Sequence, residues 1–348
     1  MSSVRNNSSQ PIIWKDDVLC LLDQRLLPTT VEYRKLETVQ SIAGAITSMV
    51  VRGAPAIGIT AAYGVVIAAR QRYTESSSQW KQNIQPDLDL LKASRPTAVN
   101  LSWAINRMKN LIETVEGDPE SPLLEEAKLI HDEDIQANKT MGELGAAYIT
   151  SNSGVLTHCN AGALATGGYG TALGVIRSAW QQDKLTKVYA DETRPWLQGS
   201  RLTAWELLQD DIPVTLVAEG AVSALMSTGQ VQWFVVGSDR IAANGDVANK
   251  IGTLAGAIQA KHFGVKVMVV APTSTIDMQA AEGAAIPVEQ RSPGELLDFS
   301  GQRVAAEGCQ AWNPVFDITP AALVDVIVTE KGVIEAPDAR KMALLMQS

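Results

Sequence analysis

The sequence predicts an α/β protein with a Rossmann-like, parallel-sheet C-terminal domain and a smaller, mainly helical N-terminal domain. From residue 155 onward, short apolar segments alternate with helix-like segments, which is typical of a parallel sheet covered by helices. Before residue 150, apolar residues instead recur at helical spacing. A chain of 348 residues is long enough for both. We expect the helical domain over 1–122, a connecting helix over 123–150 and the Rossmann-like domain over 151–348.

The N-terminal elements follow from local patterns. β-prone residues around polar turns predict a small strand layer near 12–19 and 31–33. Helical spacing of apolar residues predicts helices over 39–50, 57–69, 87–92 and 98–115. Two turns separate these helices, and their sequences are Arg52-Gly53-Ala54-Pro55 and Ser94-Arg95-Pro96.

The C-terminal elements alternate regularly. Strands are expected at Val155–Thr157, Lys187–Ala190, Val214–Val217, Trp233–Val236, Val265–Val270 and Val324–Val328. Helices are expected at Tyr169–Gln182, Leu202–Leu208, Gly220–Thr228, Lys250–Lys261 and Gly294–Leu297. The residues that follow four of these strands are Cys159, Asp191, Glu219 and Asp239. A parallel sheet collects such residues at one edge, where ligands bind.

Composition narrows the function classes. Hydrophobic residues make up 46% and charged residues 19%, as in an ordinary globular enzyme. The net charge is −9 and no Lys/Arg-rich block occurs, which argues against nucleic acid as a partner. The polar N-terminus lacks the apolar core of a signal peptide, and the uncharged run from Ala54 to Ala69 is too short to span a membrane. We therefore expect a cytoplasmic protein without a membrane segment.

No cofactor is indicated. The chain has three cysteines and three histidines, which are Cys20, Cys159, Cys309, His131, His158 and His262. Their spacing suggests neither a disulfide framework nor a metal site. A nicotinamide is disfavoured because Gly168-Tyr169-Gly170 supplies only half of G-x-G-x-x-G. The Gly-Lys-Ser/Thr sequence of a phosphate-binding P-loop is absent.

The stretch from Val155 to Gly174 carries the strongest chemical signal. An apolar strand ends in His158-Cys159-Asn160, and small residues follow. This order predicts a turn with Cys159 at its crest and then a helix start, whose dipole and free amides favour a thiolate and a bound anion. A free cysteine is often an inert core residue, but the polar turn favours chemistry. His158 is expected to point elsewhere, in a core or supporting role.

Asp239 is the second candidate for chemistry. A lone Asp after a strand is usually a helix cap or an ion pair, here with Arg240. Asn249 and Lys250 weaken that interpretation, since they place an amide and a lysine near the same strand end. The apolar segment before Asp239 would disfavour its charged form and leave it able to donate a proton.

Three further side chains are candidate ligands for a sugar phosphate. Arg52 precedes a predicted helix start, where its guanidinium and free amides can share one phosphate. Arg95 lies beside a second turn at a helix boundary. Gln198 lies in a polar loop after the second C-terminal strand, where it can bind a hydroxyl. A single arginine more often forms a surface salt bridge. The prediction for Arg52 and Arg95 therefore rests on their positions in turns at helix boundaries and not on their charge alone.

Nine motifs occur in order, namely VRGAPAIG, SRPTAVNLSWA, THCNAGALAT, GYGTALGVIR, ADETRPWLQGSRLTAWEL, GSDRIAANGDVANKIGT, APTSTID, NPVFDITP and TEKGVIEAP. From about Val31 to Pro337 the chain thereby closely resembles the methylthioribose-1-phosphate isomerases of methionine salvage. The resemblance implies an aldose–ketose isomerase that converts 5-methylthioribose 1-phosphate to 5-methylthioribulose 1-phosphate. It also implies a homodimer that uses neither a metal nor a nicotinamide.

The resemblance assigns residues as well. Its substrate-binding positions correspond to Arg52, Gly53, Ala54, Arg95, Gln198, Asn249 and Lys250. Its catalytic pair corresponds to Cys159 and Asp239. Two departures are Gly167, in place of a residue with a side chain, and Ser238, in place of the commoner Ala. The Ser238 hydroxyl would hydrogen-bond the Asp239 carboxyl group and partly offset its desolvation.

The substrate constrains the chemistry. Because its C1 hydroxyl is phosphorylated, the ring cannot open to a free aldehyde. We expect Asp239 to protonate the ring oxygen and later to take part in proton return. Hydrogen then moves from C2 to C1, either as a proton taken by the Cys159 thiolate or as a hydride in a dry pocket. The basic groups lie outside 155–174, so the phosphate is expected at the Arg52 turn, with Cys159 facing the sugar carbons.

Three other functions remain open from the sequence. Ribose-1,5-bisphosphate isomerases share the Cys/Asp pair but need further basic groups for a second phosphate, and no additional cluster is evident. The regulatory subunits of the eukaryotic translation-initiation exchange factor share the fold but lack the pair. The third alternative is a sugar-phosphate-binding module without catalysis.

Overall fold

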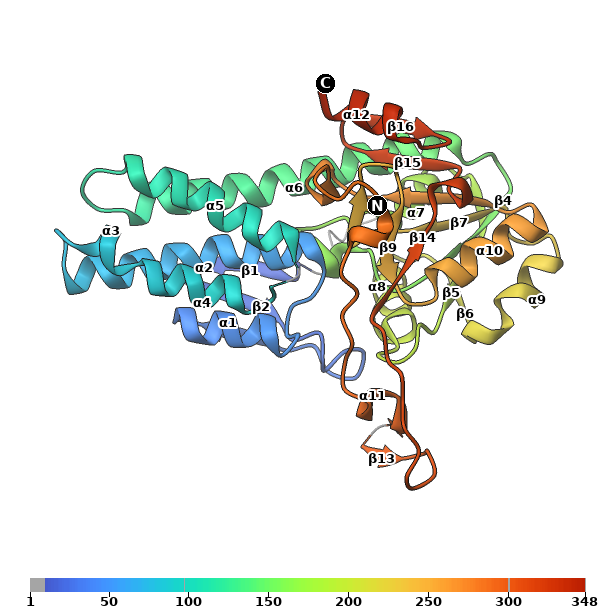
Figure 1. The fold of residues 1–348 in the computed structure, drawn as a ribbon, viewed down its shortest axis with the longest axis horizontal. Helices are drawn as coiled ribbons and strands as arrows, with labels where there is room; N and C mark the ends of the chain where they lie inside the picture. The colour runs from blue at the N-terminus through green and yellow to red at the C-terminus, as the bar shows by residue number, and fades with distance from the viewer. Residues whose placement is uncertain (1–9, 97, 300, 348) are drawn as a thin grey trace, which may run out of the picture. The chain divides into compact units, whose positions relative to one another are not determined.

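The computed structural model describes residues 10–96, 98–299 and 301–347, and its chain divides into two compact units (Figure 1). Unit 1 comprises Met1–Thr140 and Ala161–Gly174, and unit 2 comprises Met141–Asn160 and Val175–Ser348. The long helix α6 (Glu120–Tyr148) contributes to both units, which divide within it and not at the expected boundaries near its two ends. The segment Ala161–Gly174 packs with the helical unit, although the sequence suggested the α/β domain.

Unit 1 combines a small antiparallel sheet with helices, as predicted. Its strands are β1 (Ile12–Lys15), β2 (Val18–Leu22) and β3 (Tyr33–Leu36). Its helices before α6 are α1 (Val39–Thr47), α2 (Ala54–Glu75), α3 (Trp80–Asn83), α4 (Gln85–Ala93) and α5 (Val99–Thr114). Residues 56–69 of α2 are buried on every side, so this helix forms the centre of the core. That position explains the uncharged run in the sequence.

Unit 2 is built on a large sheet in the order β16-β15-β10-β7-β4-β5-β6 (Figure 1). These strands are β4 (Ser153–Thr157), β5 (Leu185–Asp191), β6 (Val214–Val217), β7 (Trp233–Val236), β10 (Lys266–Val270), β15 (Val326–Thr329) and β16 (Gly332–Glu335). All neighbouring pairs are parallel except β15 with β16. The predicted α/β fold is therefore confirmed, and β6 and β7 have the bounds that the sequence predicts.

The strand order reverses between β4 and β7. From β4 the chain proceeds through β5 to β6 on one side, and it then returns to β7 and continues through β10 to β15 on the other. In open parallel sheets the crevice at such a switch point, beyond the carboxyl ends of the strands, is the usual ligand site. Cys159 follows β4 and Asp239 follows β7, so the two candidate catalytic residues flank the switch point.

The helices of unit 2 mostly follow the predicted alternation. They are α7 (Ala172–Gln181), α8 (Ala204–Gln209), α9 (Val222–Ser227), α10 (Thr253–Phe263), α11 (Gly294–Leu297) and α12 (Ala339–Gln347). A short hairpin is formed by β12 (Asp298–Phe299) and β13 (Gln302–Arg303). Within the described ranges, no helix has the length and apolar character that crossing a membrane requires.

A second, smaller sheet carries part of the candidate site and was not predicted. Its order is β11-β8-β9-β14, with β8 (Arg240–Ala242), β9 (Val247–Lys250), β11 (Ile276–Asp277) and β14 (Phe316–Thr319). The prediction that a helix starts at Lys250 is wrong, because Lys250 ends β9 and α10 begins at Thr253. Gly252 separates them with a φ of 104°, which a helix does not allow.

The crossing of α2 and α5 depends on Gly58. A Cβ atom at Gly58 would lie 2.8 Å from the carbonyl oxygen of Asn100, which is backbone and cannot easily move. Gly44 lies in α1, and a Cβ there would meet nothing within 4 Å. Space therefore requires glycine at Gly58, whereas it does not at Gly44.

We expect Gly58→Ala to destabilise the protein by about 1–3 kcal/mol through overpacking. Gly44→Ala, the matched control, should be neutral or stabilising by up to about 1 kcal/mol, because alanine favours the helix. Denaturant unfolding of both variants measures this. Equal effects at the two positions would contradict the account of the α2–α5 contact.

Candidate active site

Cys159 is held in a strained backbone conformation directly after β4. Its φ is 62°, in the left-handed region, which costs a residue other than glycine about 1–2 kcal/mol. Its backbone N–H donates to Thr193 Oγ1 at 2.8 Å, and its carbonyl accepts from Thr203 Oγ1 at 2.6 Å. Both threonines are fully buried. Two buried hydroxyls on opposite sides of the residue thus hold the turn that presents the thiol.

The helix start that the sequence predicted behind Cys159 is not there. The segment after it contains only a short 3-10 turn, η1 (Ala163–Ala165), and α7 begins at Ala172. Tyr169 and Gly170 have φ values of 68° and 85°, which interrupt a helix. The proposed influence of a helix dipole on the thiol is therefore wrong, and the side chains around Cys159 must supply its environment instead.

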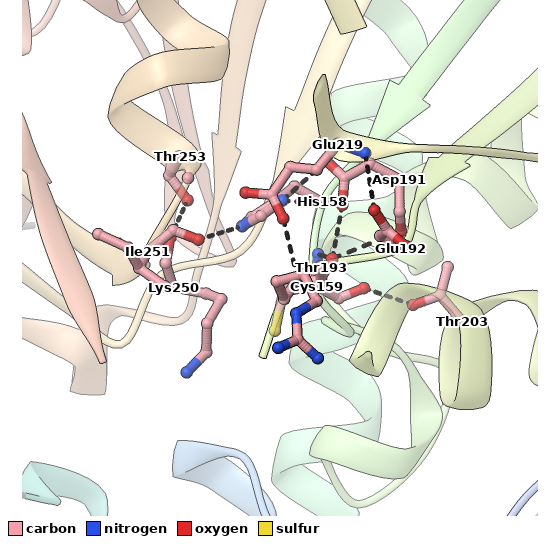
Figure 2. A network of polar contacts seen from close by, with 12 residues as sticks. His158, Cys159, Asp191, Glu192, Thr193, Thr203, Glu219, Lys250, Ile251 and Thr253 are labelled. Carbon is pink, nitrogen blue, oxygen red and sulfur yellow. Dashed lines mark hydrogen bonds and ion pairs between the residues drawn. The ribbon is translucent and has the colours of Figure 1, made fainter. Parts of the chain in front are cut away.

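A buried histidine connects this turn to the small sheet (Figure 2). His158 Nδ1 lies 2.8 and 2.9 Å from the two carboxylate oxygens of Asp191, and Nε2 lies 2.9 Å from the Ile251 carbonyl oxygen. Asp191 Oδ1 also accepts the Thr193 hydroxyl at 2.5 Å. Because a carbonyl oxygen can only accept, Nε2 carries a proton. The carboxylate favours a second proton on Nδ1, so the ring is an imidazolium.

Acidic groups surround this histidine. Burial alone would lower the pKa of His158, but the charge and hydrogen bond of Asp191 and the charge of Glu219 outweigh it and raise the pKa. Burial raises the pKa of Glu219, whose carboxylate accepts the Arg194 backbone N–H at 2.9 Å. Burial also raises the pKa of Asp317. One buried cation is therefore shared among several carboxyl groups.

Gln198 carries a buried side-chain acceptor in the segment after β5. It directly precedes a π-helical turn, Gly199–Thr203, that also supplies Thr203 to the Cys159 carbonyl. The residue is 5% exposed, and its Oε1 has no hydrogen-bond partner among the described residues. An unpaired buried amide oxygen costs free energy and is satisfied when a ligand hydroxyl donates to it. The hydroxyl-binding role that the sequence suggests for Gln198 stays a prediction.

Asp239 lies in the turn between β7 and β8 and is only partly buried. Its backbone N–H donates to the Ala248 carbonyl at 3.0 Å, which fixes it beside β9. The Ser238 hydroxyl donates to the backbone carbonyls of Arg240 and Ala248, at 3.1 and 3.2 Å. A serine has one hydroxyl proton, so the expected donation from Ser238 to the Asp239 carboxyl group is not the bond that the structure shows.

Asn249 and Lys250 lie at the end of β9 and are both buried. The Asn249 amide donates to Thr253 Oγ1 at 3.0 Å, and the Thr253 hydroxyl donates to the Lys250 carbonyl at 2.7 Å. The Lys250 ammonium lies 5.3 Å from the Phe316 ring centroid. Figure 2 shows the Lys250 and Cys159 side chains extending from the network toward the same side.

The remaining predicted ligands lie in unit 1. Arg52, Gly53 and Ala54 form the turn before α2, with Gly53 at the N-cap position and a φ of 96°. A Cβ on Gly53 would lie 2.5 Å from the Ala165 carbonyl oxygen, so glycine is required both for conformation and for space. Arg95 follows α4 in the predicted turn and is partly buried. Within unit 1, the Arg52 turn therefore packs directly against the glycine-rich segment.

Gly167 is explained by the same segment. Its N–H donates to Asp134 Oδ2 at 2.7 Å, and its carbonyl oxygen lies 2.9 Å from His131 Nε2. A side chain there would approach His131 Cδ2 to 2.6 Å. Two residues of α6 thus hold this backbone, and glycine is needed for the close approach.

Sequence reasoning missed the buried network behind Cys159. It assigned His158 a core or supporting role and did not single out Thr193 or Thr203. The signal was present, because Asp191 ends the strand beside the one that His158 follows. The partners are 33 residues apart in sequence, and only the parallel pairing of β4 with β5 brings them together.

Comparison with known proteins shows the family to which this chain belongs. The chain matches the Initiation factor 2 subunit family over residues 50–336, and it belongs to that family. Within it, the chain belongs to the methylthioribose-1-phosphate isomerases. A methylthioribose-1-phosphate isomerase of Thioalkalivibrio sulfidiphilus is 61% identical over 336 residues, covering 97% of this chain and 96% of the relative.

Solved structures agree. A 5-methylthioribose 1-phosphate isomerase from Pyrococcus horikoshii OT3 superimposes with a TM-score of 0.91 at 41% identity, covering 97% of this chain and 96% of that one. A protein from A. fulgidus described as translation initiation factor eIF-2B, subunit delta, gives a TM-score of 0.89 at 39% identity, covering 98% and 100%. Since both names occur on this fold, the fold alone does not distinguish catalysis from regulation.

The raised pKa of His158 predicts a pH-dependent stability. A histidine whose pKa is raised on folding stabilises the native state fully below its unfolded pKa of about 6.5 and loses that contribution as pH rises through the folded pKa. The free energy of unfolding of wild type relative to His158→Gln should therefore decline above about pH 6.5. His262→Gln, at an exposed position of α10, is the matched control. A difference that is constant or grows with pH would contradict the buried cation.

Proposed function

We propose that this protein catalyses the isomerisation of 5-methylthioribose 1-phosphate to 5-methylthioribulose 1-phosphate in L-methionine salvage. The family membership supports the assignment of the reaction, and one structural observation supports the assignment of the catalytic residues. Cys159 and Asp239 stand at the carboxyl ends of β4 and β7, the two strands that flank the switch point of the sheet. A ligand bound in that crevice has a thiol from one strand and a carboxyl group from the other.

The chemistry follows from the phosphorylated C1. Asp239 donates a proton to the ring oxygen as the bond between C1 and that oxygen breaks. The hydrogen on C2 moves to C1, either through the Cys159 thiolate or as a hydride, and the C2 hydroxyl becomes the ketone as its proton returns to the Asp239 carboxylate. Each proton that leaves a side chain is returned to one, so the protons and electrons of the reaction balance without a cofactor.

We propose substrate-binding roles for the other predicted residues. In unit 2, Gln198 and Asn249 are proposed to bind sugar hydroxyls, with Lys250 as a cation beside them. The unpaired Oε1 of Gln198 supports its part. In unit 1, we propose that Arg52 and Arg95 bind the phosphate together with the backbone of Gly53 and Ala54. Arg52 directly precedes the Gly53 N-cap of α2, where no described side chain caps the helix, and this position suits a phosphate dianion.

We propose further that the enzyme works in the cytoplasm as a homodimer without a metal or nicotinamide. The family resemblance supports these assignments. The order of the parallel strands, numbered along the chain as 3-2-1-4-5-6, supports a Rossmann-like sheet.

Purified protein should form a ketose from 5-methylthioribose 1-phosphate, followed by NMR, and much less from ribose 1,5-bisphosphate. Cys159→Ser and Asp239→Asn should each lower kcat by about 10²–10⁴-fold while the protein stays folded. Cys309→Ser, at an exposed cysteine, is the control. Near-normal turnover in Cys159→Ser or Asp239→Asn would remove that residue from the mechanism. A ketose from the bisphosphate alone would reassign the substrate, and no ketose from either would favour a regulatory role.

Gln198→Met should separate activity from stability. It removes the amide oxygen that has no partner among the described residues but keeps the length of the side chain, so the melting temperature should stay or rise. The lost hydrogen bond to a hydroxyl should lower kcat/KM by roughly 2–13-fold. Gln259→Met, at another buried amide oxygen without a described partner, is the control for stability and should leave kcat/KM unchanged. Unchanged kcat/KM in Gln198→Met would contradict the hydroxyl contact.

A further inference from the structure

The buried network behind Cys159 has a direction. The Cys159 N–H donates to Thr193 Oγ1, and the Thr193 hydroxyl donates to Asp191 Oδ1. Asp191 accepts His158 Nδ1, whose Nε2 donates to the Ile251 carbonyl. The direction of each bond is fixed, because a peptide N–H only donates, a carboxylate or carbonyl oxygen only accepts, and the Thr193 hydroxyl accepts from one and donates to the other.

This series of hydrogen bonds runs between two backbone segments that carry proposed site residues, Cys159 and Lys250. His158 precedes Cys159, and Ile251 follows Lys250. The ring therefore connects the end of β4 to the end of β9, which belong to different sheets. Figure 2 shows the imidazole lying between these two backbones.

The groups packed around the His158 imidazole restrict its movement. A Cβ on Gly252 would lie 2.8 Å from His158 Cε1 and 2.5 Å from Glu219 Oε1, so the backbone of Gly252 packs against both groups. The charged groups that face the ring come from three elements, as Asp191 ends β5, Glu219 begins the turn after β6, and Asp317 lies on β14. Asp317 also accepts the N–H groups of Gly252 and Leu254 at 2.8 and 3.1 Å, which fixes the start of α10.

We propose that His158 and Asp191 are positioning residues, which hold the Cys159 thiol and the Lys250 strand end at a fixed spacing through Thr193 and the Ile251 carbonyl. The importance of this spacing for turnover rests on the proposed function of Cys159 and Lys250. The positioning itself does not, because it concerns only the conformation of the Cys159 turn. Without the Thr193 hydroxyl, the strained peptide loses the acceptor of its N–H, and the turn relaxes.

A merely structural role predicts something different. If the network only filled the core, its loss would lower stability without a specific effect on the thiol. If it positions Cys159, turnover falls while the thiol of this residue, which is only 9% exposed, becomes more accessible. Opposite changes in turnover and in thiol reactivity therefore identify positioning.

The test uses the full-length protein with Cys20→Ala and Cys309→Ser, which leaves Cys159 as the single thiol. Into this parent we would place Thr193→Val, which loses the hydroxyl at equal shape, and Thr193→Ser, which keeps it. Asp191→Asn removes the charge that orients Thr193. Asp23→Asn is the control, since Asp23 is an equally buried carboxylate paired with Arg25 and Arg34 in unit 1.

Thr193→Val and Asp191→Asn should lower kcat by about 100-fold, the effect of displacing a reacting group by about 1 Å, with little change in KM. Alkylation of Cys159 by iodoacetamide should become faster in both. Thr193→Ser should restore both quantities, and Asp23→Asn should leave both as in the parent. Parent-like kcat and alkylation in Thr193→Val and Asp191→Asn would overturn the proposal. If the parent turned over no substrate, the proposed function would fail, and the alkylation rates alone would still decide the positioning.

Discussion

The contact between His158 and Asp191 is the interaction on which the rest of the site depends. Both side chains are almost completely buried, and removing one partner of such a pair costs about 3–5 kcal/mol, because the other charge is left without compensation. A pair this costly to break keeps a fixed geometry. That rigidity extends through Thr193 to the strained turn at Cys159 and through Ile251 to the strand that carries Lys250.

The topology explains why these groups meet. Parallel strands bring their carboxyl ends to one edge, so the residues at the ends of β4, β5 and β6 become neighbours although helices separate these strands in sequence. The small sheet adds what the parallel sheet lacks. It follows β7 directly, ties Asp239 to β9 through the Ala248 carbonyl, and places an amide and a lysine in buried positions.

Much of this fold could be predicted, because strands buried on both faces form continuous apolar runs. The segment Trp233–Val236 is such a run, and its predicted bounds agree with the structure. β9 could not be recognised in this way, since half of it is Asn249 and Lys250, and its burial depends on β8 and β14. The start of α7 was misplaced because small residues suit a helix in sequence, whereas left-handed backbone at Tyr169 excludes one. The candidate site was predicted by residue type and resemblance, but the support behind Cys159 depends on pairings between distant strands.

The protonation state of the His158 ring, on which the network depends, can be measured by NMR. With three histidines in the chain, ¹⁵N-histidine labelling gives few signals, and His158→Gln assigns the one of interest. A buried imidazolium between a carboxylate and a carbonyl predicts that both ring nitrogens carry protons at neutral pH. A His158 ring with one unprotonated nitrogen at neutral pH would contradict the account.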